Sequence, residues 1–98
     1  MKLAIQLLSG FGSQDLRTAT RLAEAALAQG HQVGIFLMED AVYLVNQFKG
    51  LADKGADVSL CAHNAHQRGV AKVDYILWGG QPDWAQMVHD ADRVICLG

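Results

Sequence analysis

A chain of 98 residues is the length of one domain, and residues 1–98 are expected to fold as a single unit. The net charge is −2 and the eight Lys and Arg are scattered, which argues against nucleic-acid binding through phosphate neutralisation. No apolar run approaches the roughly 18 residues of a membrane span, so no membrane partner is expected. A domain of this size buries only about 60–65% of its unfolded surface. Because 51% of the residues are hydrophobic, we expect another subunit to cover part of this chain.

The chain opens with a short apolar run, Leu3 to Leu8, that ends in the turn Ser9 to Gly12. The run is too short for a signal peptide and no small-residue cleavage site follows, so it predicts a buried strand. Without an export signal, the two cysteines are expected to stay reduced in the cytoplasm. Apolar residues at three- and four-residue spacing from Leu16 to Leu27 then predict a helix, capped by Ser13 and ended by Gly30.

The rest of the chain continues to alternate strands with helices. Further strands are expected at Val33–Met38, Val58–Leu60, Tyr75–Trp78 and Arg93–Leu97. The helical segments expected between them are an irregular helix from near Ala41 to Lys54, a short turn at Ala62–Gln67 stopped by Gly69, and a helix at Asp83–His89 opened by Pro82. This order predicts an α/β fold: a mainly parallel five-stranded sheet with helices on both faces, in three layers.

Cys61 is the strongest candidate for chemistry. Ligands gather at the carboxyl ends of parallel strands, and Cys61 stands at such an end and at the amino end of a helix, where free amides favour the thiolate. His63 and His66 follow within five residues and would support a thiolate if one were protonated nearby, while Asn64 and Arg68 are expected to shape the pocket. A thiolate is the species that attacks disulfide and sulfane sulfur. The alternative is a buried structural cysteine.

Other chemistries fit these residues less well. The cysteine and the two histidines offer three metal ligands where a closed zinc site takes four, so no metal is expected. Gly10 and Gly12 begin a dinucleotide fingerprint, but Asp15 stands where its third glycine belongs and would repel a phosphate, so no nucleotide cofactor is expected. Glu39 and Asp40 are expected to be capping and solvated turn residues after the second strand.

The remaining large or reactive side chains predict structural roles. Trp78 and Trp84 are expected in the core or in a subunit contact. Cys96 lies inside an apolar strand, which favours core packing. A role for Cys96 as the resolving partner of Cys61 stays open, because sequence cannot place two sulfurs within bonding distance.

Several segments share their order and spacing with one known family. They are Gly10–Ser13 before an alanine-rich helix, Ala25–Val33, Ile35–Val42, Val58–Cys61 ahead of Arg68–Val70, and Ala91–Ile95. Taken together over most of the chain, they resemble the DsrE/DsrF/TusD family of sulfur-relay proteins. The resemblance implies that Cys61 carries a persulfide, which it receives from one partner thiol and passes to another without a cofactor. It also implies a trimer or a hexamer.

We therefore expect a sulfur-relay protein with Cys61 as its catalytic residue. The residues expected around its thiolate are His63, Asn64, His66, Gly12 and Ser13. The expected partners are sulfur donor and acceptor proteins with reactive thiols, beside further copies of this chain or related subunits. Two alternatives stay open: a non-catalytic oligomeric assembly module of the same fold, and a thiol-redox protein that uses Cys61 and Cys96.

Overall fold

One five-stranded sheet organises the chain, and the computed structural model describes all of its residues, Met1–Gly98. Every strand pairing is parallel, and the strand order is β4-β3-β2-β1-β5. The strands are β1 Lys2–Leu7, β2 Gln32–Leu37, β3 Asp57–Cys61, β4 Leu77–Gly79 and β5 Arg93–Leu97. The helices are α1 Asp15–Ala28, the 3-10 helix η1 Glu39–Phe48, α2 Lys49–Asp53, α3 Ala62–Gln67 and α4 Gln81–Asp90. The expected α/β class, with a parallel sheet between helices, is confirmed.

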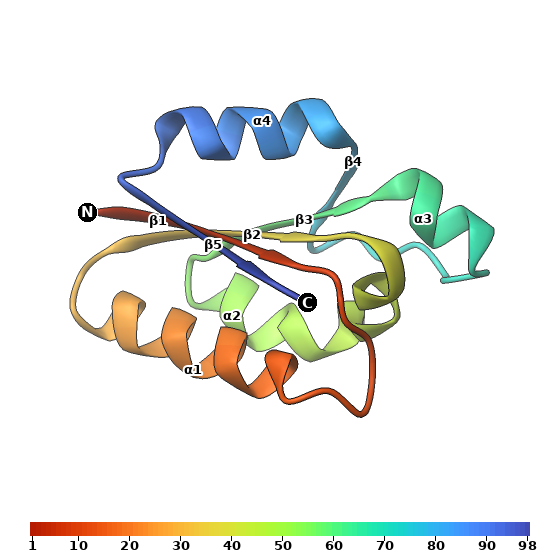
Figure 1. Cartoon of the computed structure of the whole chain (residues 1–98), viewed down its shortest axis with the longest axis horizontal. Coiled ribbons are helices and arrows are strands. Elements are labelled where there is room, and N and C mark those ends of the chain that lie inside the picture. The colour runs from red at the N-terminus through yellow and green to blue at the C-terminus, as the bar shows by residue number, and fades with distance from the viewer.

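Helices cover the two faces of the sheet unequally, as Figure 1 shows. In this view α1 and α2 lie below the sheet, α4 alone lies above it, and α3 projects beyond the end of β3. Neighbouring residues of a strand point to opposite faces. Ile5 and Ile35 therefore pack into the cluster below the sheet, whereas Ala4 and Phe36 face α4. None of the helices is both long and apolar enough to cross a membrane.

Several predicted boundaries move by one or two residues. The irregular helix after β2 begins at Glu39 rather than near Ala41, and it is a 3-10 helix followed by a short α-helix. Helix α1 begins at Asp15, so Ser13 is not its N-cap residue. The Ser13 hydroxyl nevertheless accepts the Asp15 backbone N–H at 3.0 Å, which satisfies one free amide of the first turn. The turn Ala62–Gln67 lies where it was predicted.

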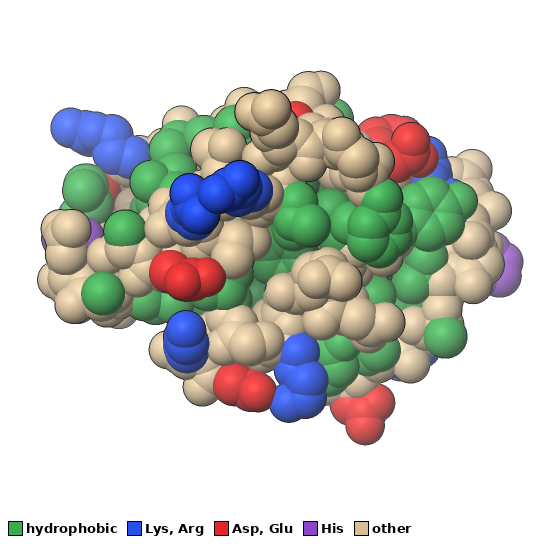
Figure 2. Space-filling view, turned by 90° about the horizontal axis from the view of Figure 1, so that it is seen from below, with side chains coloured by type: hydrophobic (Ala, Val, Ile, Leu, Met, Phe, Trp, Pro, Cys, Tyr) green, Lys and Arg blue, Asp and Glu red, His purple; other side chains and the backbone are tan.

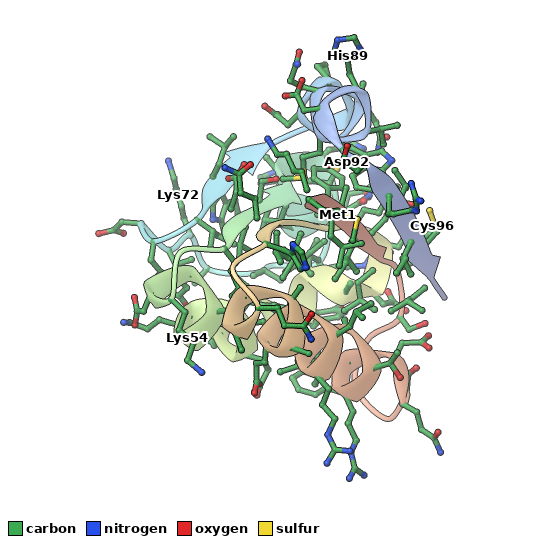
Figure 3. All side chains as sticks on the ribbon, turned by 90° about the vertical axis from the view of Figure 1, so that its left-hand side faces the viewer. Met1, Lys54, Lys72, His89, Asp92 and Cys96 are labelled. Carbon is green, nitrogen blue, oxygen red and sulfur yellow. The ribbon has the colours of Figure 1, made fainter.

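The core prediction for Cys96 is wrong, because its side chain is exposed. β5 is an edge strand, and Ile95 and Leu97 are the residues that turn toward the large cluster below the sheet. Val94 and Cys96 face the other way, where α4 does not cover them. Figure 3 shows Cys96 pointing outward from this edge. The two tryptophans do pack into the interior, Trp78 against the lower cluster and Trp84 against the upper one.

Candidate functional site

The loops after β1, β2 and β3 meet at the carboxyl edge of the sheet, as parallel topology predicts. Gly10 lies so close to Asp40 that a Cβ at Gly10 would be 3.1 Å from the Asp40 carbonyl oxygen. The Asn64 side-chain oxygen accepts the Glu39 backbone N–H at 2.8 Å. The absence of a side chain at Gly10 and the hydrogen bond of the buried Asn64 amide therefore let the three loops lie close together near the start of α3.

Cys61 ends β3 and is the N-cap residue of α3, as the sequence predicts. Its Sγ accepts the backbone N–H of Asn64 at 3.5 Å. The residue is only 8% exposed, and its side chain belongs to a small cluster with Ala4, Phe36 and Met87 on the α4 face. The thiol thus lies at the carboxyl edge of the sheet, and it is largely buried there.

The cluster that contains Cys61 is apolar. Met38 and Trp84 pack against it, and the Trp84 ring stacks on Phe36 with 6.0 Å between centroids. The Gln6 side-chain amide donates to Met38 Sδ at 3.1 Å, which holds that thioether at the end of β2. We call Met38 and Trp84 the cover of this cluster. With Cys61 itself only 8% exposed, water has little access to the thiol.

The two histidines do not join the thiol. His63 and His66 are both exposed, and neither is hydrogen-bonded to Cys61. The structure holds no group of three or more His, Cys, Asp or Glu side chains placed to bind a metal ion. Among the residues expected around the thiol, Asn64 is therefore the one in direct contact with it.

Gly12 and Ser13 also lie apart from the thiol. Gly12 is exposed and has a φ of +87°, a conformation that glycine adopts without strain. The Ser13 hydroxyl is occupied by the N–H of Asp15, and Ser13 lines a groove along α1. Helix α1 covers the face of the sheet opposite to the one from which Cys61 projects. The structure accordingly separates this turn from the thiol.

Arg68 fastens two of the loops to each other. Its Nε donates to Asp40 Oδ1 at 2.9 Å, and its Nη2 donates to Glu39 Oε2 at 3.3 Å. The hydrogen bond to Asp40, aided by the nearby carboxylates, raises the pKa of the Arg68 guanidinium above its ordinary value. The two acids are thus ion-paired rather than merely solvated, and Arg68 shapes the site by tying β2 to α3. Opposite charges after neighbouring strands were the sequence signal for this cluster.

The sheet keeps the two cysteines apart. Cys61 lies on β3 and Cys96 on β5, with β2 and β1 between them. At the spacing of about 4.8 Å between strands, they are roughly 14 Å apart. A disulfide requires Cα atoms within about 7 Å, so the geometry argues against a redox pair within one chain.

Comparisons with known proteins agree on one family. A family model described as the DsrE/DsrF-like family matches residues 1–97. An uncharacterized protein of Methanopyrus kandleri is 30% identical in an alignment of 101 positions that covers 87% of this chain and 84% of that protein. Sulfurtransferase TusD of Enterobacter sp. strain 638 is 28% identical in an alignment of 88 positions that covers 72% of this chain and 69% of TusD.

Two solved structures share the fold. The ychN protein of E. coli superposes with a TM-score of 0.81 at 24% identity and covers 97% of both chains. A conserved protein of unknown function from Bacteroides thetaiotaomicron superposes with a TM-score of 0.76 at 16% identity, covering 97% of this chain and 93% of its own. At these identities the likeness concerns the architecture alone.

Proposed function

This chain belongs to the DsrE/DsrF-like family, and from that membership we propose that it is a sulfur-relay protein that carries sulfane sulfur as a persulfide on Cys61. The observation that carries the proposal is the position of this thiol. It ends β3 at the carboxyl edge of the sheet and accepts the Asn64 N–H, within the residues that the family model spans. The sulfurtransferase relative TusD supports the same kind of chemistry.

The proposed transfer has two steps and no net oxidation. The Cys61 thiolate attacks the outer sulfur of a donor persulfide, the new S–S bond forms at Sγ, and the donor leaves as its thiolate. An acceptor thiolate then attacks the outer sulfur on Cys61 and releases the Cys61 thiolate. Each step exchanges one S–S bond for another, so no cofactor is consumed. The partners of this scheme are one donor and one acceptor protein, each with a reactive thiol.

The burial of Cys61 limits how a partner thiol can reach it. Because the residue is 8% exposed and Met38 and Trp84 pack against its cluster, we propose that a partner thiol reaches Sγ when this cover moves aside. The same cover would slow the attack of small reductants on a bound persulfide between the two steps. We propose that donor and acceptor proteins open the site when they dock, so that transfer is faster between proteins than from small molecules.

The test is sulfur loading followed by intact-protein mass spectrometry. Cys96→Ser, which leaves Cys61 as the single thiol, should gain the mass of one or more sulfur atoms after incubation with polysulfide and lose it again with reductant. The matched variant Cys61→Ser/Cys96→Ser, which has no thiol, should gain none. If folded Cys96→Ser gains no more sulfur than this thiol-free variant, with polysulfide or with a protein persulfide as the donor, Cys61 is not the carrier.

A second function is favoured by the same burial. A thiol that packs with Phe36 and Met87 fits a structural cysteine in a non-catalytic assembly module. Under that reading the Cys96→Ser protein gains no sulfur while folded, whether the donor is polysulfide or a protein persulfide, but gains it after denaturation in urea. If the folded protein gains sulfur, it is not solely a non-catalytic assembly module.

We also propose that copies of this chain, or related subunits, assemble into a trimer or a hexamer. Large apolar side chains stand exposed at several places, among them Phe11 at 68%, Leu77 at 54% and Val94 at 42%. Figure 2 shows hydrophobic side chains gathered between charged ones on the face below the sheet. Contact with another subunit would remove such surface from water. Sedimentation of a monomer at micromolar concentration would contradict this proposal.

A further inference from the structure

A small cavity lies under α4, toward the amino-terminal half of β3 and away from the carboxyl-edge loops. Its volume is about 140 Å³. Charged groups dominate its lining, with three carboxylates and one ammonium: Asp57, Asp83, Asp90 and Lys2. No ion pair joins Lys2 to any of these acids. The cavity therefore carries a formal excess of negative charge that no neighbouring side chain neutralises by direct contact.

A buried hydroxyl without a partner lies in the same lining. Ser59 is 1% exposed, and its Oγ makes no hydrogen bond. Alternation along β3 directs Ser59 to the same face as Asp57, beneath α4, and Ser59 lies beside Leu77 of β4 in the sheet register. A buried polar group that lacks a partner is unfavourable and unusual. A ligand in this cavity would provide one.

The form of the cavity favours an organic cation over a metal ion. Metal ions hold carboxylate oxygens at about 2.0–2.6 Å, and the acids here are not grouped closely enough for that. Two of them are already held in place, because Asp83 accepts the Gly80 N–H at 2.8 Å and Asp90 accepts the Gln86 amide at 3.1 Å. Each of these carboxylates keeps lone pairs that can accept hydrogen bonds from a cation over longer distances than a metal ion requires.

We propose that the cavity under α4 binds a primary alkylammonium group, whose N–H groups are accepted by Ser59 and by the surrounding carboxylates. The Ser59 hydroxyl would accept one ammonium N–H and donate its own proton to a carboxylate, which satisfies both of its capacities. The apolar side chains of Leu77 and Met87 in the same lining would contact the alkyl stem. A free small amine and the side chain of a partner's lysine share this chemistry. Neither depends on Cys61, so the inference stands apart from the sulfur-relay proposal.

The test is a titration of the full chain, followed through its amide NMR signals. The probes are n-butylammonium, a blocked lysine (Nα-acetyl-lysine N-methylamide) and, for comparison, tetramethylammonium, which carries the same charge but has no N–H to donate. We expect n-butylammonium to shift the amides of Ser59, Leu77 and Met87 saturably, and tetramethylammonium to leave them unchanged. Tighter binding of the blocked lysine would identify the source as a partner's lysine, and tighter binding of n-butylammonium would identify a free amine.

Two variants and a control locate the site. Ser59→Ala and Asp57→Asn should each weaken n-butylammonium binding by about tenfold, because each removes a hydrogen bond to a charged group. Glu24→Gln removes one negative charge from α1 on the opposite face, and its binding should match the parent. Equal binding by all three variants, or shifts that sodium chloride reproduces, would overturn the proposal. Binding that appears only in Lys2→Met would also overturn it, because Lys2 itself would then be the resident cation.

Discussion

The two faces of the sheet differ greatly in how much apolar surface they bury. Between the sheet and the helices α1, η1 and α2, 19 buried residues form one cluster, whereas the cluster between the sheet and α4 has 4. The Cys61 thiol and the cavity at Ser59 both belong to the thinner side. Because apolar burial is the dominant favourable term in folding, the lower face holds the fold together. The upper face can accommodate a thiol, a cavity and an unpartnered hydroxyl that a dense core would exclude.

Truncations of one large side chain on each face should separate these roles most strongly. Phe48→Ala removes a fully buried ring from the lower cluster and should destabilise the protein by about 3–5 kcal/mol. Met87→Ala acts on the upper cluster, beside an existing cavity, and should lower stability by only about 2 kcal/mol. Urea unfolding followed by circular dichroism measures both. Equal losses would mean that the two faces contribute alike.

The two cysteines should differ in how fast they are alkylated. Cys96 is exposed and should react with iodoacetamide freely, while Cys61 reacts only after local opening of its cover. We expect Cys61 to be slower by about a hundredfold, equivalent to about 2.7 kcal/mol of opening. Trp84→Ala thins that cover and should speed only Cys61, as measured by peptide mass spectrometry over time. Similar rates at the two cysteines in the parent protein would contradict this account of the cover.

Local signals explain what the sequence could predict. Runs of apolar residues punctuated by turn residues are sufficient to order the strands and helices, and they place Cys61 where β3 meets α3. The apolar run around Cys96 looks the same whether its strand is central or at an edge. Only the strand order, which puts β5 at the edge with α4 elsewhere, makes Cys96 exposed. That order depends on contacts between distant segments.

Within the site, the sequence predicted the position of Cys61 but not most of the contacts around it. Proximity in sequence suggested that His63 and His66 would support the thiol, but both turn to solvent from α3. The contacts that do build the site join segments far apart, as Arg68 joins Asp40 across 28 positions and Asn64 joins Glu39 across 25. Such pairs become neighbours only because β2 and β3 are adjacent in the sheet.

Asn64 joins the start of α3 to the residues after β2, and its removal should have an intermediate effect. Asn64→Ala leaves the Glu39 N–H without its 2.8 Å acceptor and should destabilise the protein by about 1–2 kcal/mol. The same change should speed alkylation of Cys61, because the start of α3 is less firmly held. His63→Ala is the matched control on α3; its exposed side chain should alter stability by less than about 0.5 kcal/mol. If the two variants unfold alike, the hydrogen bond from Asn64 to Glu39 does not stabilise this junction.

The smallest effect concerns the backbone where β2 ends. Glu39 has a φ of +52°, the one residue other than glycine with a positive value, and such a conformation costs an L-residue roughly 1 kcal/mol. Glu39→Gly and Asp40→Gly each remove one carboxylate partner of Arg68 and each add the same glycine flexibility. Only the first relieves the backbone, so Glu39→Gly should be the more stable of the two by about 1 kcal/mol.

The comparison should be made in about 1 M salt, where a screening length of about 3 Å suppresses the unequal ion pairs to Arg68. Thermal unfolding of the two variants then reports the backbone term alone. A difference near the expected size would mean that the backbone after β2 stores strain at the residue that hydrogen-bonds Asn64. Equal melting temperatures would mean that η1 and the Arg68 cluster hold Glu39 in this conformation without cost.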